Sequence, residues 1–162
     1  AYNHVIGKRP GDANLVTAAS SGSALLISQG KFGKFDETAV RWLGALGADY
    51  GVIAVAANSP IKSLKDLVAA YAKTPNEFPV GGGGAVGSQD WMKAALMAKN
   101  AGREPKTMRY VALEGGGAVV TALEGGHIKI ASGDAAEMAQ HHAAGKIRIL
   151  AVTSGQGLPG TL

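Results

Sequence analysis

The chain has 162 residues, of which 46% are hydrophobic and 17% are charged. This length fits one domain, or one domain with part of another, and the composition is that of a globular protein. The formal net charge is +4 at pH 7, but the lysines and arginines are scattered along the chain. A nucleic-acid-binding protein usually gathers them on one face with interleaved aromatic residues, so we expect no nucleic-acid partner.

The absence of cysteine excludes disulfides, thiolate catalysis and cysteine-based zinc sites. No apolar run approaches the roughly 18 residues that a membrane helix needs. The longest candidate, residues 51–57, has the length of a buried strand. We therefore expect a chain that does not itself span a membrane.

The first part of the chain contains short apolar segments separated by turns. The end of a helix is predicted at 1–7, a strand at 15–19, a helical segment at 24–28, and β-type runs at 40–48 and 51–57. Ser20 and Ser21 lie in a turn of small residues. The next helix is predicted to begin after Ser63, with Asp66 three residues later in a near capping-box arrangement, and to end before Pro75.

Strands and helices alternate regularly from residue 77 onward. Strands are predicted at 78–80, 107–113, 127–131 and 146–153, with a helix over 88–101, one after residue 117 and one ending at 144. Strands that alternate with helices of about 10 residues indicate βαβ units. The fold class is therefore predicted to be α/β, with a mainly parallel sheet flanked by helices.

Glycine and other small residues stand at each predicted passage from strand to helix, at 81–88, 115–117 and 132–134. In a parallel sheet these junctions lie at the carboxyl edge, where open α/β folds bind ligands. Free N–H groups and the helix dipole at a helix start attract anions such as phosphate or carboxylate. The pattern favours an anion site over the alternative, a glycine-rich connection that only turns the chain.

Residues 82–87 also satisfy the dinucleotide-binding pattern G-x-G-x-x-G, and Glu114 follows the next predicted strand. Consecutive glycines satisfy this pattern easily, so a nucleotide-binding enzyme stays an alternative. The P-loop pattern is not met, because Gly87 is followed by Ser88 and not by the lysine that contacts the phosphates.

No catalytic or metal-binding group is predicted. His141 and His142 are adjacent, so on a helix they point about 100° apart and cannot both bind one metal. The serines in turns lack the nucleophile-elbow pattern and are expected to cap helices or to donate to a ligand. Asp134, at the end of a predicted strand, could accept a proton from a ligand hydroxyl or amine.

Five stretches together resemble a known family: PIKSLKDL at 60–67, GGGAVGS at 82–88 with Asp90, YVALEGGG at 110–117, LEGG at 123–126 and AGKIRILAVTS at 144–154. In order and spacing, residues 16–162 resemble the periplasmic solute receptors of tripartite tricarboxylate transporters, the Bug receptors. The resemblance implies a two-lobed, hinged receptor of the periplasmic-binding-protein type (type II-like). Such a receptor closes on a small di- or tricarboxylate in the periplasm and delivers it to a membrane permease, without catalysis and without a cofactor.

The resemblance also assigns ligand contacts and domains. It implies Gly84, Ala85, Gly87 and Ser88 as contacts in the second lobe, with Gly116 and Gly117 flanking them, and Ser20 and Ser21 on the first lobe. Gln89, next to Ser88, and Asp134, at its strand end, complete the set of expected ligand-binding residues. Residues 1–59 are expected to be a fragment of the first lobe with hinge strands, 60–151 the second lobe, and 152–162 a return segment. Relative to the two-lobed family, the chain is expected to be truncated.

Overall fold

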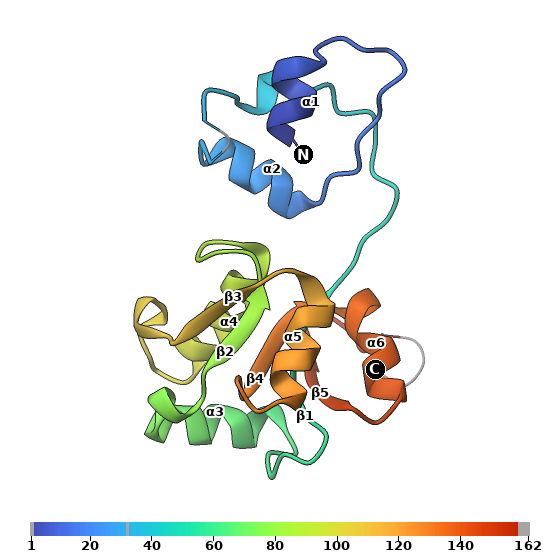
Figure 1. The fold of residues 1–162 in the computed structure, drawn as a ribbon. Coiled ribbons are helices and arrows are strands. Elements are labelled where there is room, and N and C mark those ends of the chain that lie inside the picture. Colours follow the sequence, from blue (N-terminus) through green and yellow to red (C-terminus); the bar gives the residue numbers. More distant parts are fainter. Residues whose placement is uncertain (1, 32, 159–162) are drawn as a thin grey trace. The chain divides into compact units, whose positions relative to one another are not determined.

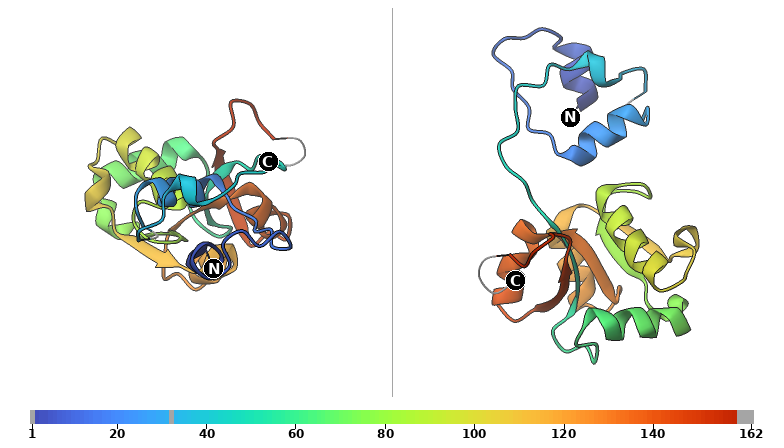
Figure 2. Two further views of the ribbon diagram at one scale, coloured as in Figure 1. Left: turned by 90° about the horizontal axis from the view of Figure 1, so that it is seen from above. Right: turned by 180° about the vertical axis from the view of Figure 1, so that it is seen from behind.

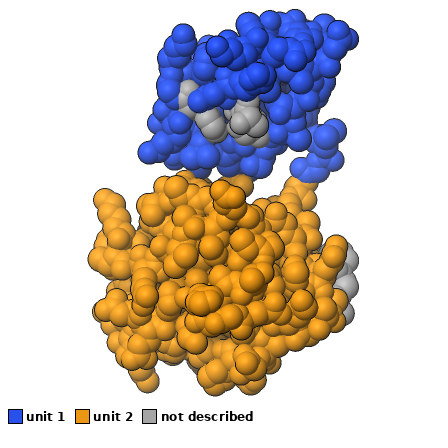
Figure 3. All heavy atoms as spheres, in the orientation of Figure 1, with its two compact units in different colours: residues 1–47 blue, residues 48–162 orange. Residues whose placement is uncertain are grey.

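The computed structural model describes residues 2–31 and 33–158 and divides into two compact units, Ala1–Gly47 and Ala48–Leu162 (Figure 3). The predicted boundaries at residues 59 and 151 stay a prediction. The predicted return segment, 152–162, and the predicted helix end at 1–7 lie partly outside the described residues.

The first unit contains α1 (Tyr2–Lys8), α2 (Ser21–Ser28) and the short 3₁₀ helix η1 (Glu37–Ala39). Ser20 caps α2 because its side chain accepts a hydrogen bond from the Ser23 N–H. The helices predicted at 1–7 and 24–28 are thus present in the described residues, the second with an earlier start.

Two predicted strands of this region, 15–19 and 40–48, are wrong, because both segments have no regular structure. The second exposes large apolar side chains, with Leu43 72% and Trp42 53% accessible. A strand requires a neighbouring strand for its backbone hydrogen bonds. The described part of the first unit contains no strand, so an apolar β-type pattern in this region has no partner with which to form a sheet.

The second unit is built on a five-stranded sheet with the order β3-β2-β4-β1-β5 (Figure 1). Its strands are β1 (Gly51–Ala56), β2 (Val80–Gly83), β3 (Tyr110–Leu113), β4 (Ile130–Asp134) and β5 (Ile147–Val152). β2 pairs in parallel with β3 and β4, whereas β1 pairs antiparallel with β4 and β5. Since β5 therefore points the same way as β4, the sheet is mainly parallel, as predicted.

Helices cover both faces of this sheet (Figures 1 and 2). On one face, α3 (Leu64–Lys73) and α4 (Gln89–Asn100) pack around the buried Tyr71. On the other, α5 (Gly115–Glu124) and α6 (Ala135–Ala143) pack around the buried Met138. Two further 3₁₀ helices, η2 (Pro75–Glu77) and η3 (Pro105–Thr107), lie between these elements. The predicted α/β class is confirmed as three layers, helices, sheet and helices.

Alternation along β1 explains how one strand serves both cores. Val52 and Ala54 belong to the cluster under α5 and α6, whereas Ile53 belongs to the cluster under α3 and α4. Successive side chains of a strand point to opposite faces, so an unbroken apolar run is typical of a strand buried on both sides.

Several predicted boundaries are corrected. Gly81 to Gly83, expected in a loop, extend β2, and residues 132–134, expected in a turn, complete β4, which begins at Ile130 and not at 127. Residues 115–117 form the first turn of α5 instead of preceding it. The shifts at Gly81–Gly83 and at 132–134 have the same cause: small residues at strand ends were interpreted as turns, although pairing with neighbouring strands keeps them extended.

Gly82 shows why side chains are missing from the end of β2. A Cβ atom on Gly82 would lie 2.7 Å from the Tyr110 hydroxyl oxygen and 2.8 Å from Asp90 Cβ. A Cβ on Gly81 would lie 2.5 Å from Ile128 Cδ1. Glycine weakens a strand, but it allows a close approach of neighbouring groups to the backbone. The close packing of Tyr110 and Asp90 over β2 therefore requires glycine.

We expect Gly82→Ala to destabilise the second unit by about 1–3 kcal/mol, since the new methyl group overlaps two neighbouring atoms. Urea unfolding measures this change. Gly117→Ala is the matched control, because nothing lies within 4 Å of its added Cβ, and alanine favours helix. Equal stability of the two variants would contradict this account of β2.

Candidate functional site

The carboxyl ends of β2, β3 and β4 meet at one edge of the sheet (Figure 1). Gly83 is in register with Leu113, and Gly82 with Ser132. The helices α4, α5 and α6 each begin directly beyond one of these strands. The predicted convergence of three strand-to-helix junctions is therefore present, and we call this region the ligand edge.

A tight turn over residues 84–88 joins β2 to α4. Gly84 and Gly87 have φ angles of 78° and 90°, which disfavour residues with a side chain. The Gly84 N–H donates to the Leu113 carbonyl at 3.0 Å, and the Tyr110 hydroxyl donates to the Gly84 carbonyl at 3.3 Å. The turn is thus fixed to β3, while Ala85 is exposed.

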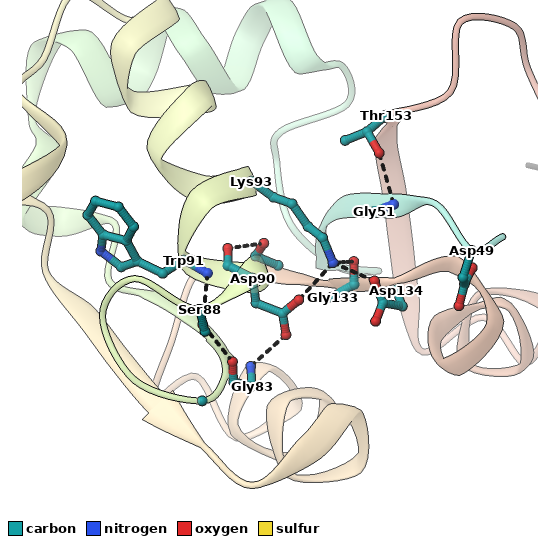
Figure 4. A network of polar contacts seen from close by, with 12 residues as sticks. Asp49, Gly51, Gly83, Ser88, Asp90, Trp91, Lys93, Gly133, Asp134 and Thr153 are labelled. Carbon is teal, nitrogen blue, oxygen red and sulfur yellow. Dashed lines mark hydrogen bonds and ion pairs between the residues drawn. The ribbon is translucent and has the colours of Figure 1, made fainter. Parts of the chain in front are cut away.

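Ser88 is the N-cap of α4. Its hydroxyl oxygen accepts from the Trp91 N–H at 3.3 Å and its hydroxyl donates to the Gly83 carbonyl at 3.0 Å (Figure 4). The single hydroxyl proton of Ser88 therefore already has an acceptor within the chain. Ser88 stabilises the turn, and its hydroxyl could donate to a ligand only if its hydrogen bond to the Gly83 carbonyl were broken.

Asp90, Lys93 and Asp134 form a network behind this turn (Figure 4). The Lys93 ammonium donates to Asp90 Oδ1 at 2.7 Å, to Asp134 Oδ1 at 2.5 Å and to the Gly133 carbonyl at 3.1 Å. Asp90 Oδ2 accepts from the Gly83 N–H at 2.7 Å. These bonds join the start of α4 to the ends of β2 and β4.

Lys93 uses all three of its N–H donors in this network, since a lysine ammonium has three. Its side chain is only 12% accessible. Burial lowers the pKa of Lys93, but the hydrogen bonds and charges of Asp134 and Asp90 outweigh burial and raise that pKa above its ordinary value. Lys93 therefore stays charged at neutral pH and has no donor left for a ligand.

Buried polar contacts complete the edge. The Ser132 side chain is fully buried, and its hydroxyl donates to the Asp90 carbonyl at 2.7 Å. Burial raises the pKa of the Tyr110 hydroxyl, so this hydroxyl stays protonated and can donate a hydrogen bond at neutral pH. The edge is thus held by side chains that do not depend on a bound molecule.

The other predicted site residues are distributed as follows. Gln89 is the half-buried first residue of α4, Gly116 is buried beside Glu137, and Gly117 is exposed in the first turn of α5. Ser20 and Ser21 cap and begin α2 in the first unit, which is described separately. The predicted residues of the second unit thus cluster at the starts of α4, α5 and α6, and their roles as ligand contacts stay a prediction.

The sequence analysis missed Lys93 and Tyr110, and it expected Ser132 to cap a helix or to donate to a ligand, whereas its hydroxyl donates to the Asp90 main-chain carbonyl. A signal existed for Lys93, because it lies three residues after Asp90 on the same helix, a spacing that favours an ion pair. Its contact with Asp134, 41 residues later, depends on the order of strands in the sheet. No periodicity in the sequence contains that information.

Two pockets of the second unit lie away from the ligand edge. A pocket of about 460 Å³ lies at the opposite edge of the sheet, between Ile61 and Phe78, the residue that follows η2. Another of about 340 Å³ lies along β5, lined by residues 149–152, 154–157 and His142. Neither pocket is lined by the residues of the ligand edge.

His142 contacts the chain itself, with Nδ1 3.2 Å from the Ile147 carbonyl oxygen. Among the described residues, no three metal-ligating side chains gather at one point. No helix in the described part of the chain is long and apolar enough to cross a membrane.

We expect Lys93→Met to destabilise the second unit by about 1–3 kcal/mol, because it leaves Asp90 and Asp134 without their shared cation. Since the folded protein raises the Lys93 pKa, this stabilisation is fully present below the ordinary lysine value of 10.5 and is lost only as pH rises through the raised pKa. Urea unfolding at pH 6 and pH 9 should therefore give the same difference from wild type. Lys99→Met, on the exposed side of α4, is the control. A difference that shrinks between pH 6 and pH 9 would contradict the assignment.

Comparisons with known proteins point to one family. The model of the tripartite tricarboxylate transporter family receptor matches residues 39–159. A comparison with curated protein sequences gives no match. A solved solute-binding protein of this family from Polaromonas, without ligand, is 27% identical, with a TM-score of 0.59 over 68% of this chain and 36% of that chain.

Two solved proteins from Rhodopseudomonas palustris share the fold. MatC, with bound malate, is 15% identical, with a TM-score of 0.59 over 67% of this chain and 35% of that chain. Another, with adipate, is 23% identical, with a TM-score of 0.56 over the same shares. The chain thus spans about a third of the length of these proteins. Since the family model covers most of the sequence, this chain belongs to the family of tripartite tricarboxylate transporter receptors.

Proposed function

We propose that this chain forms the ligand-binding lobe, with parts of a second lobe, of a receptor that captures a small organic di- or tricarboxylate. The observation that carries the proposal is the convergence of three helix starts at the ligand edge, in a chain of this receptor family. A helix start presents backbone N–H groups and the positive end of the helix dipole, which favour a carboxylate.

Recognition on this lobe relies on the main chain. Because the Lys93 ammonium is committed to Asp90 and Asp134, the network offers no free cation to an anionic ligand. The turn over 84–88 and the first turn of α5 at Gly116 and Gly117 supply the backbone donors instead. Hydrogen bonds to an ionised carboxylate stabilise a complex by about 1.5–3 kcal/mol each, so a few of them suffice for specific binding.

The remaining assignments extend the proposal. Residues 1–59 supply part of the first lobe, with Ser20 and Ser21 as contacts, residues 60–151 the second lobe, and 152–162 the return segment. Closure of the lobes is a hinge motion. The malate and adipate in the two R. palustris proteins support a carboxylate ligand. As a member of this family, the receptor works in the periplasm, hands its ligand to a membrane permease and catalyses no reaction.

Two other functions are less well supported. In a nucleotide-binding enzyme the glycines of G-x-G-x-x-G turn the chain beneath a pyrophosphate. Here Gly82 and Gly83 belong to β2 and pair with β3, so the first two residues of that pattern lie in a strand and not in a turn. In a structural module the small residues would serve packing alone. Gly81–Gly83 fit this function, but a structural module does not account for the match to the receptor family.

We expect Ser88→Ala and Gly87→Val each to weaken carboxylate binding by the full-length receptor about tenfold or more, because both change the shape of the turn. Isothermal titration calorimetry measures the affinity. Ser63→Ala and Gly102→Val are matched controls, an N-cap serine and a glycine with φ of 69° away from the ligand edge. Unchanged affinity in both site variants would remove the turn from the site.

A thermal-shift panel separates the three functions. A ligand at 100 times its Kd stabilises the folded protein by about 2.7 kcal/mol, so it raises Tm measurably. Di- and tricarboxylates should raise Tm if the chain is a receptor, and NAD or FAD should do so if it is a nucleotide-binding enzyme. No shift with any compound, on the full-length receptor, would support the structural module.

A further inference from the structure

The ligand edge carries an acceptor that an unsubstituted dicarboxylate cannot use. Asp134 stands at the end of β4, directly before α6, and its side chain is 38% accessible. Oδ1 accepts from Lys93, whereas Oδ2 has no hydrogen-bond donor among the described residues. Asp134 also does not cap α6 with its side chain, although it occupies the N-cap position.

Charge balance at the network makes this acceptor consequential. Asp90 and Asp134 carry two negative charges, against the single positive charge of Lys93. Both oxygens of the Asp90 carboxylate already accept hydrogen bonds, Oδ1 from Lys93 and Oδ2 from the Gly83 N–H. The net charge of the network is therefore negative. Asp134 therefore repels a dianion that binds here. A hydroxyl or ammonium group of the ligand that donates a hydrogen bond to the Asp134 carboxylate offsets this repulsion.

Lys93 keeps the acceptor in position. It holds Asp134 Oδ1 at 2.5 Å and the adjoining Gly133 carbonyl at 3.1 Å, so the orientation of the Asp134 carboxylate is defined before a ligand arrives. The carbon chain of Lys93 lies against Gly51, where an added Cβ would come within 2.5 Å of Lys93 Cδ. The acceptor is thus part of a packed framework.

We propose that this edge selects carboxylates that bear a hydroxyl or ammonium group, with Asp134 accepting the hydrogen bond from that group. This inference rests on the proposed receptor function. The backbone donors at the helix starts bind the carboxylate, and the substituent faces Asp134. A hydroxyl gives one charge-assisted hydrogen bond, and an ammonium adds an attraction between opposite charges.

The test compares acids of equal length by calorimetry on the full-length receptor. One set is succinate, malate and aspartate, and the other is glutarate, 2-hydroxyglutarate and glutamate. We expect at least one substituted acid to bind about tenfold or more tightly than the plain acid of its set. Plain acids that bind as tightly as the substituted ones would overturn the inference and leave the receptor function standing. Absence of binding by any of the acids would overturn both.

Variants assign the selectivity to a residue. Asp134→Ala should reduce the preference to within about threefold while the plain acid still binds, and a preference that survives in Asp134→Ala would overturn the inference. Asp134→Asn keeps the size of the side chain and removes its charge, so it should weaken the binding of aspartate and glutamate most. It replaces Asp134→Ala in the test if the alanine variant does not fold. The control is Asp66→Asn, which removes a carboxylate from the first turn of α3 and should leave the preference unchanged.

Discussion

Close packing at the end of β2 is the constraint from which the ligand edge follows. Tyr110 and Asp90 lie so near the backbone of Gly82 that a single Cβ would collide with both. This approach lets the Asp90 carboxylate reach the Gly83 N–H, and that bond fixes the position of Asp90 relative to the strand. Asp90 in turn gives Lys93 one of its two carboxylate partners. The absence of side chains on Gly82 and Gly83 therefore determines the geometry of groups on α4 and β4.

The same glycines bear on the anion site expected from the sequence. Both interpretations of the glycine run are partly right, for different residues. Gly82 and Gly83 are needed for packing within the sheet, whereas Gly84 and Gly87 adopt positive φ in the exposed turn. The region that we propose to bind the ligand is thus shorter than the glycine run. It consists of the turn over 84–88 and the adjoining helix starts.

Much of the fold was predictable because its signals are local. The capping of α3 by Ser63 and the alternation of strands and helices follow from patterns local in the sequence, and the meeting of three junctions at one edge follows from that alternation, because it indicates parallel strands. The network around Lys93 was not predictable, because it joins residues 41 positions apart through the order of the strands. The strand expected at 40–48 failed for a related reason, since an apolar pattern does not indicate whether a partner strand is present.

The ligand edge also lies against the point where the chain enters and leaves the sheet. The Gly51 N–H donates to Thr153 Oγ1 at 2.9 Å, and the Thr153 N–H donates to the Gly51 carbonyl at 2.8 Å (Figure 4). The start of β1 and the residue after β5 are therefore bonded to each other. The Lys93 side chain packs on Gly51 while its ammonium donates to Asp134, so one side chain connects the end of β4 with the start of β1, although the two residues of each contact lie more than 40 positions apart in the sequence.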